Sequence, residues 1–121
     1  APADVNAMPK GIAATERTYR DAEDLKWAVR QWAARIDVRL AEIHVREMRR
    51  KWASVSTGGR LTLGQDLLRL PRDLAEFIIV HELVHLLVPN HGKVFTSFMH
   101  AYLPDWADRA RRLRGTTPPP A

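Results

Sequence analysis

The sequence has no cysteine among its 121 residues, so a disulfide scaffold and a cysteine-ligated metal site are both excluded. It also lacks an apolar run long enough to cross a bilayer, since His81, Glu82 and His85 interrupt the longest one. No secretory leader is visible. These absences predict a cytoplasmic protein with no membrane contact, and we expect it to be a monomer.

Negative charge is in shorter supply than positive charge. The chain has 14 Asp and Glu against 19 Lys and Arg, which gives a net charge of +5 and a sequence pI of about 10.2. Basic residues, mostly arginines, cluster at 46–51 and 109–114. Such a surface raises the chance of contact with nucleic acid or nucleotide phosphates. Solvated faces of an arginine-rich protein explain the same clusters, and no nucleic-acid-binding motif accompanies them.

Segments without a periodic pattern are confined to the two ends of the chain. Residues 1–16 contain Pro2, Pro9 and Gly11 and predict a flexible tail. Residues 115–121 form a proline-rich end with no core residues. The 45% hydrophobic content and the remaining length fit a single domain, which we place at residues 17–114.

The region that organises the chain is an apolar segment with His81, Glu82 and His85 in the pattern H-E-x-x-H. On a helix, residues i and i+4 share one face, so both imidazoles can bind one metal ion. Glu82 is one residue, about 100° of helical rotation, from His81, which puts its carboxylate beside the ion without making it a ligand. It is then placed to accept a proton from metal-bound water. The pattern predicts a zinc site with Glu82 as the catalytic base.

A third ligand is expected from His91, six residues after His85. Pro89 cannot continue a helix, so the chain should turn back and bring His91 under the metal. The ligand spacing matches that of the metzincins, but Val88 stands where they have glycine and no methionine turn is evident. The turn geometry must therefore differ, and we do not infer metzincin membership. Three neutral histidines leave one position open, as in catalytic sites, and predict one Zn²⁺ per chain.

The histidines have a simpler interpretation as ordinary residues of a core helix. Five constrained identities, namely three His, one Glu and a Pro that ends the helix, argue against it. The predicted helix is apolar on nearly all sides, and burying His and Glu there without a partner would be costly. We interpret His44 and His100, in contrast, as surface or packing residues.

The remaining pattern indicates elements in the order α-β-β-β-α-α-α, which predicts an α+β fold. Asp21 is a plausible N-cap of the first helix, Gly58-Gly59 marks a hairpin turn, and Pro71 suits the first turn of the central helix. The expected elements are a helix over about 22–35, a strand over 38–40 and 43–45, strands over 51–56 and 60–63, the central helix from 71, and helices over about 92–102 and 104–114.

Several segments resemble the YgjP-like zinc metallopeptidases, relatives of the SprT-like zincins. The likeness includes the histidine motif and continues into Pro89-Asn90-His91-Gly92 and Phe95. Upstream, residues 51–56 are similar to the family's Arg-Trp-Gly-Ser-Cys-Ser hairpin, and downstream, residues 104–106 resemble its Pro-Asp-Tyr segment. The likeness extends over about residues 43–114, which is most of the predicted domain.

The chain departs from this family pattern at a few positions. Ala53 stands in place of the usual glycine, Val55 in place of the usual cysteine, and Thr96-Ser97 where the family often has tryptophan. None of these departures removes a proposed ligand or Glu82. They therefore bear on substrate contacts more than on zinc binding.

The resemblance implies a zincin-like fold, in which a small antiparallel or mixed sheet packs beside the central helix and further helices follow at the C-terminal end. It also implies that an edge strand above the cleft pairs with an extended peptide, and the hairpin at 51–64 is the best candidate. We accordingly place substrate contacts at Trp52 and Ser54 on this hairpin and at Tyr102, which also fits the apolar stripe of its own helix. The implied partner is a peptide or unfolded protein.

The main functional hypothesis is zinc-dependent hydrolysis of peptide bonds, with Glu82 as the base. The resemblance brings in a second hypothesis, because YgjP-like proteins have also been described as nucleotide pyrophosphatases, and the arginines would then contact a nucleoside triphosphate. Against it, the sequence has no glycine-rich phosphate loop and no carboxylate cluster for Mg²⁺. A third hypothesis is a nucleic-acid-associated zinc-binding module without turnover, which would not need Glu82.

Overall fold

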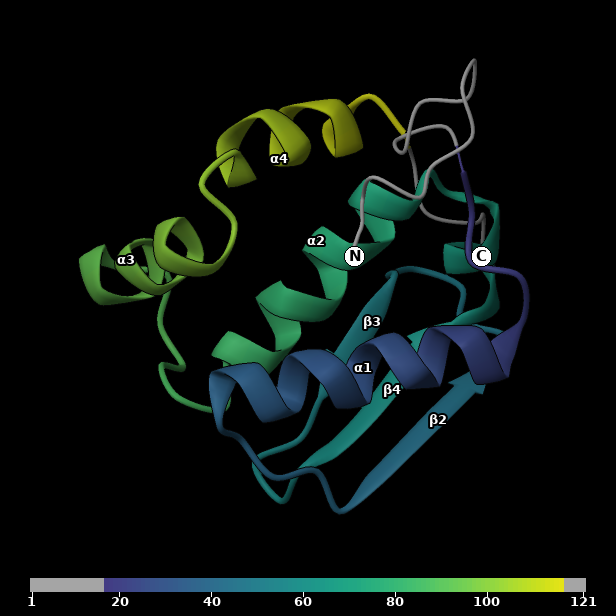
Figure 1. Ribbon diagram of the computed structural model, residues 1–121, viewed down its shortest axis with the longest axis horizontal. Coiled ribbons are helices and arrows are strands. Elements are labelled where there is room, and N and C mark those ends of the chain that lie inside the picture. Colours follow the sequence, from purple (N-terminus) through teal and green to yellow (C-terminus); the bar gives the residue numbers. More distant parts are fainter. Residues whose placement is uncertain (1–16, 117–121) are drawn as a thin grey trace.

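The computed structural model describes residues 17–116; the tail predicted at 1–16 and most of the tail predicted at 115–121 lie outside this range. Four α-helices and a short 3₁₀ helix accompany a three-stranded sheet (Figure 1). The elements are α1 (Ala22–Ile36), β2 (Glu42–Arg46), β3 (Ala53–Val55), β4 (Arg60–Gly64), η2 (Gln65–Arg69), α2 (Arg72–Val84), α3 (Lys93–Tyr102) and α4 (Trp106–Arg114). The predicted α+β class is confirmed. Within the described range, the helices are too short or too polar to cross a membrane.

The sheet is mixed, with the strand order β2-β4-β3. β3 and β4 form the predicted hairpin and pair antiparallel, with Ser54 opposite Thr62, although β3 covers only the middle of the strand predicted over 51–56. Gly59 in the turn has a φ of 89°, a conformation that residues with side chains rarely adopt. β2 pairs parallel to β4, with His44 opposite Thr62. β3 is therefore an edge strand, and it packs against α2.

The prediction of a strand over 38–40 is wrong. Asp37 adopts a left-handed conformation (φ 66°) at the end of α1, and the N–H of Val38 bonds to the carbonyl oxygen of Ala33. The chain is thus still closing the helix where its alternating pattern indicated a strand. Pairing in the sheet begins only at Glu42.

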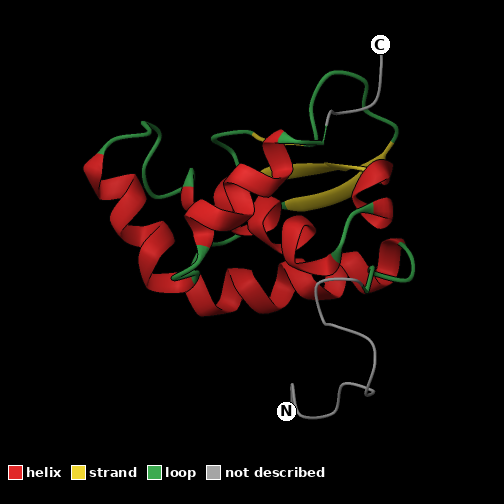
Figure 2. Cartoon of the chain, turned by 90° about the horizontal axis from the view of Figure 1, so that it is seen from above, coloured by secondary structure: helices red, strands yellow, loops and turns green. Residues whose placement is uncertain are grey.

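The helices α1 and α2 lie over one face of the sheet (Figure 2), and their first residues follow the sequence signals. At the predicted N-cap of α1, the side chain of Asp21 accepts a hydrogen bond of 2.9 Å from the N–H of Asp24. α2 starts directly after Pro71, which has no N–H to leave unpaired. Most of the large side chains that are buried completely come from both helices and from β4, and η2 and α3 add one each: Leu25, Val29, Leu61, Leu63, Leu67, Ile79, Val80, Leu83, Val84 and Met99.

α4 is attached to α2 largely through charged side chains. The residues predicted to face inward, Trp106, Ala110 and Leu113, are only partly buried against the core. Arg112 of α4 bonds to both carboxylate oxygens of Asp73, at 2.7 and 3.1 Å. A two-point bond between guanidinium and carboxylate groups is both strong and directional, so it fixes the position of α4 on α2.

Glu76 joins three helices through its two carboxylate oxygens. Oε1 accepts a bond of 2.8 Å from Arg109 in α4, and Oε2 accepts one of 3.0 Å from the indole N–H of Trp32 in α1. The Arg109 side chain is only 14% exposed. Without Glu76, the Arg109 guanidinium would keep only Asp105 and the carbonyl oxygen of Asp73 as partners.

We therefore expect Glu76→Ala to lower the free energy of unfolding by about 1–3 kcal/mol, because Arg109 loses one of its two carboxylates and the Trp32 indole loses its acceptor. Glu23→Ala is the matched control. Its carboxylate is 79% exposed in a pair with Lys26, and its loss should cost at most about 0.5 kcal/mol. Denaturant unfolding measures both changes, and equal losses would show that the Glu76 bridge adds no particular stability.

Candidate active site

The H-E-x-x-H segment lies at the C-terminal end of α2. His81 and Glu82 are in its last turns, and His85 is the C-cap with helical dihedral angles (φ −62°, ψ −22°). The N–H of Val88 still bonds at 2.9 Å to a carbonyl oxygen of the last turn, so the helical path continues until Pro89 ends it. The two imidazoles therefore share one face, as the spacing predicts.

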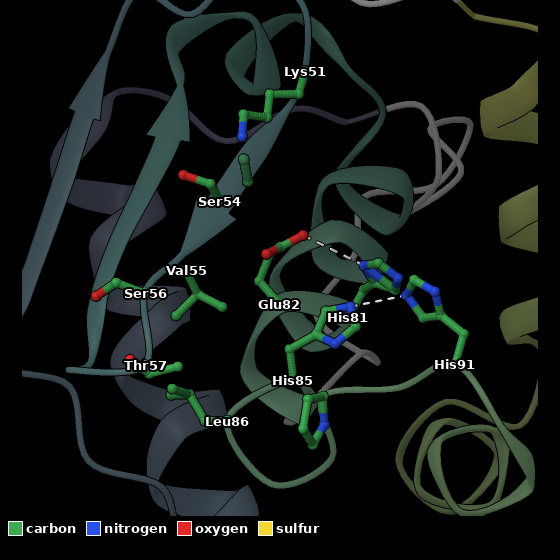
Figure 3. A pocket seen from close by; sticks show the side chains of 12 residues that line it. Lys51, Ser54, Val55, Ser56, Thr57, His81, Glu82, His85, Leu86 and His91 are labelled. Carbon is green, nitrogen blue, oxygen red and sulfur yellow. Dashed lines mark hydrogen bonds and ion pairs between the residues drawn. The ribbon is translucent and has the colours of Figure 1, made fainter.

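His91 lies in the loop after α2, and its side chain turns back towards the two helical histidines (Figure 3). Its Nε2 lies 2.9 Å from Nε2 of His85, and one ligand nitrogen from each of the three histidines lies within 4.8 Å of the others. Three nitrogens bound to one tetrahedral zinc ion would be about 3.3 Å apart, so small side-chain movements bring all three to one ion. Two Nε2 lone pairs at 2.9 Å also repel each other unless a proton or a cation lies between them.

Two phenyl rings hold the imidazoles in place. The buried ring of Phe95, from α3, has its centroid 5.2, 4.7 and 4.9 Å from those of His81, His85 and His91. Phe77, one turn earlier in α2, stacks on His81 at 5.8 Å. These contacts limit the rotamers of the histidines and exclude water from the inner side of the site. The sequence pattern identifies Phe95 only as part of an apolar stripe.

Burial favours the uncharged form of the two helical imidazoles. It lowers the pKa of His81 to about 4, an effect that the neighbouring His85 and His91 increase, and it lowers the pKa of His85 as well. Nδ1 of His85 lies 3.3 Å from the carbonyl oxygen of Val88, so this nitrogen donates and Nε2 has a free lone pair. Imidazoles that are neutral at pH 7 are in the form that binds metal ions.

The pKa of Glu82 is shifted in the opposite direction. Burial raises the pKa of its carboxyl group to about 7, and the positive charge of Lys51 opposes this rise. The side chain is 15% exposed, and Oε2 lies 3.4 Å from Nδ1 of His81. A carboxyl group with a pKa near neutrality is suited to exchange a proton at pH 7.

The histidines open into a cavity of about 560 Å³ between α2 and the β3–β4 hairpin (Figure 3). The hairpin side is lined by Lys51, Ala53, Ser54, Val55, Ser56 and Thr57, and the helix side by His81, Glu82, His85, Leu86, Pro89 and His91. The edge strand that the family resemblance implied is thus directly opposite the metal-binding residues.

The three predicted substrate contacts are not all brought to this cavity. Ser54 lines it, whereas Trp52 is half-buried against the core and is not among the lining residues. Tyr102 is directed elsewhere: its ring meets that of Trp32 edge-on at 6.4 Å and stacks on Phe98 at 6.4 Å. Tyr102 therefore packs as its apolar stripe indicates, and the geometry does not support it as a substrate contact.

The sequence analysis did not name two of the lining residues, Leu86 and Lys51. For Leu86 a signal exists, because it is four residues after Glu82 and helical spacing places both on the same face. Lys51 belongs to a basic cluster, and only the folded hairpin places it at the cavity. His44, in contrast, pairs with Glu42 at 2.7 Å on an exposed strand and takes no part in the site.

Three imidazoles and a neighbouring carboxyl group in an open cavity form the arrangement of a metal-dependent hydrolase. The family model of the YgjP-like metallopeptidase domain matches residues 5–116 of this chain. The chain therefore belongs to the YgjP-like family and is a metallopeptidase, as the histidine motif and the hairpin predicted. No curated protein is similar enough in sequence to count as a match.

Two solved structures have a similar fold. The metallopeptidase zymogen jannalysin of Methanocaldococcus jannaschii aligns with a TM-score of 0.68 and 22% identity, which covers 75% of this chain and 94% of jannalysin. The metallopeptidase zymogen abylysin of Pyrococcus abyssi aligns with a TM-score of 0.66 and 19% identity, which covers 80% of this chain and 99% of abylysin. At this level of identity the likeness concerns the fold, and it confirms the small sheet packed beside a central helix.

The opposite pKa shifts predict opposing effects of pH on the stability of the metal-free protein. The folded pKa of His81, about 4, is below the ordinary 6.5, so His81 makes the protein less stable as pH falls through this window. The folded pKa of Glu82, about 7, is above the ordinary 4.5, so Glu82 makes the protein less stable as pH rises through this window. We expect Glu82→Gln to remove the second effect, so that stability rises more steeply with pH than in the wild type.

Denaturant unfolding of chelator-treated protein at about pH 5, 6 and 7 measures these slopes. The control is Glu23→Gln, at a carboxylate that is 79% exposed, and it should follow the wild type. Parallel pH profiles for the wild type and Glu82→Gln would contradict a raised pKa at Glu82.

Proposed function

We propose that this chain hydrolyses peptide bonds with one zinc ion held by His81, His85 and His91 and with Glu82 as the proton acceptor. The observation that carries the proposal is the convergence of three imidazole nitrogens, within 4.8 Å of one another, beside a buried carboxyl group in one cavity. Membership of a metallopeptidase family supports the reaction class. The presence of Glu82 favours a catalytic ion, since a purely structural site has no use for that carboxylate.

Zinc is the ion that this donor set favours. Three imidazoles would supply three ligands and leave a fourth position open, as in catalytic zinc sites. When bound, zinc supplies Lewis-acid chemistry, because it lowers the pKa of a water in the fourth position and polarises the carbonyl group to be cleaved. Calcium and magnesium prefer oxygen ligands, whereas the triad of His81, His85 and His91 offers only nitrogen.

The position of Glu82 suits proton transfer. Its carboxyl group shares the cavity with the triad, and its pKa of about 7 makes both protonation states accessible at neutral pH. As a carboxylate, Glu82 accepts the proton of the attacking water on Oε. As a carboxylic acid, it returns that proton to the leaving amine. One residue thus serves both halves of the reaction.

The substrate that the cavity wall suits is an extended peptide. β3 is the edge strand of the sheet, so one side of its backbone is not engaged with β4, and its residues line the cavity opposite the histidines. A substrate strand added to this edge would pass in front of the triad, held by main-chain hydrogen bonds. A segment must be unfolded to bind in this way, which favours peptides and unfolded proteins.

The geometry gives less support to a nucleotide substrate. Among the residues that line the cavity, Lys51 is the one with a permanent positive charge. The C-terminal arginines, candidates for phosphate contacts, are paired with carboxylates: Arg109 with Glu76, Arg111 with Asp108, and Arg112 with Asp73. A triphosphate needs several cationic groups around it, and the cavity lining offers it a single one.

We expect His81→Ala, His85→Ala and His91→Ala each to weaken zinc binding by at least about 100-fold, because each variant lacks one of three ligands. His44→Ala is the matched control, since His44 pairs with Glu42 and does not line the cavity. It should keep the wild-type affinity and bind one zinc ion per chain. Competition with a chromophoric chelator measures affinity and stoichiometry, and tight binding by His91→Ala would exclude the loop histidine from the ligand set.

In zinc-loaded protein, Glu82→Gln should lower peptide cleavage by about 10²–10⁴-fold and leave zinc bound, because an amide cannot accept the proton. The substrates to compare are an unfolded protein, with and without DNA, and nucleoside triphosphates, and Glu23→Gln is the control variant. Glu82-dependent release of pyrophosphate would establish nucleotide hydrolysis instead. Zinc binding without turnover of any substrate would establish a binding module.

A further inference from the structure

The cavity differs in charge between its two ends. Figure 3 shows Lys51 beyond Glu82 at one end, and Leu86 beyond His85 at the other. Lys51 comes shortly before β3, and it lines the same wall as Ser54. A substrate that lay along β3 would therefore pass an ammonium group on one side of the histidines and an aliphatic side chain on the other.

The Lys51 ammonium group is not used by the fold. In the part of the chain that the structure describes, it makes no hydrogen bond or ion pair. Its charge favours the ionised form of Glu82, which among residues 17–116 is the only carboxylate that lines the cavity and which lies beside the histidines. The lysine can therefore pair with an acidic group that a ligand brings.

We propose that Lys51 is a carboxylate-binding subsite that selects peptide substrates with an acidic group close to the cleaved bond. The inference rests on the function proposed above and adds a substrate preference to it. An ammonium group has three donors, and charge-assisted bonds to a carboxylate are stronger than neutral ones.

The spacing along the hairpin limits where the acidic group can be. Lys51 is three residues before Ser54, which corresponds to about 10 Å of extended chain at roughly 3.3 Å per residue. A substrate strand paired with β3 advances at the same rate, and the long lysine side chain covers part of this distance. The acidic group should therefore be about one to three residues from the cleaved bond.

The opposite end of the cavity favours a different side chain. Val55 and Leu86 contribute aliphatic surface there, and apart from the histidines no charged residue other than Lys51 and Glu82 belongs to the lining. Substrates with an acidic group on one side of the cleaved bond and an aliphatic residue on the other would match both ends. The test should therefore use two peptide series, one with an aliphatic residue on the N-terminal side of the cleaved bond and one with it on the C-terminal side.

The test uses acetylated and amidated peptides that differ only in having Glu or Gln at one position near the cleaved bond. For the wild type, we expect kcat/KM to favour Glu by about tenfold or more at one position within about three residues of that bond. Lys51→Gln should bring the ratio close to unity, and Lys51→Arg should keep it. Lys51→Glu should reverse the preference, so that Lys is favoured over Gln at the same position.

Arg50→Gln is the matched control, because it removes a positive charge from the exposed neighbour of Lys51 that does not line the cavity. It should keep the wild-type ratio. Equal loss of the preference in Arg50→Gln and Lys51→Gln would overturn the subsite, since the general charge of the hairpin would then be responsible. The absence of any preference for Glu in the wild type would overturn it as well.

A second peptide series, without acidic side chains but with a free C-terminus, identifies the source of the carboxylate. A preference for this series that Lys51→Gln abolishes would support the subsite and assign it to the terminal carboxylate. Binding of labelled Glu and Gln peptides to zinc-loaded Glu82→Gln protein, followed by fluorescence anisotropy, gives the same ratio without turnover. A Lys51-dependent ratio in binding, with no cleavage by the wild type, would support the subsite and reject the reaction. Cleavage of both peptides at equal rates would support the reaction and reject the subsite.

Discussion

Helix α2 with its C-cap has two roles, because it forms the centre of the core and carries two of the three imidazoles. The arrangement of the neighbouring elements follows from these two roles. Ile79 and Val80 are buried completely, while His81 and Glu82 on the adjoining face stay partly open to the cavity. Helical periodicity makes the separation possible, because successive side chains point about 100° apart. The neighbouring elements complete it: α1 and the sheet cover the apolar face, and Phe95 from α3 supports the imidazoles from the inner side.

The convergence of the three histidines was predictable because their arrangement depends on short spacings. His81 and His85 are one helical turn apart, and Pro89 shows where the chain has to leave the helix, so His91 can return only through a short loop. Sheet topology carries no comparable local signal. The alternation within β2 is the same whether β2 pairs with β3 or, as observed, runs parallel to β4. The register of distant strands is decided by the packing of the whole domain.

The lining of the cavity was harder to predict, because distant segments form it. Tyr102 is near the histidines in the sequence, yet its ring packs against Trp32 in α1. Lys51 is far from Glu82 in the sequence, yet both line one cavity. The basic clusters also separate on folding: Arg112 is neutralised by a carboxylate of α2, and Lys51 keeps its charge available at the cavity. A count of charges in the sequence does not distinguish these two situations.

The short length of β3 also affects how copies of the protein meet one another. A strand edge that is open to a substrate is equally open to a strand from a second copy, and such edge-to-edge pairing is a common start of aggregation. Here the edge strand covers only Ala53–Val55, and Lys51 stands just before it. Two copies that approached edge to edge would gain few hydrogen bonds and would bring positive charges into the same interface. The short edge and the charge before it therefore make pairing between two copies less favourable than at a long, uncharged edge, whereas a single substrate strand brings no second lysine of this kind.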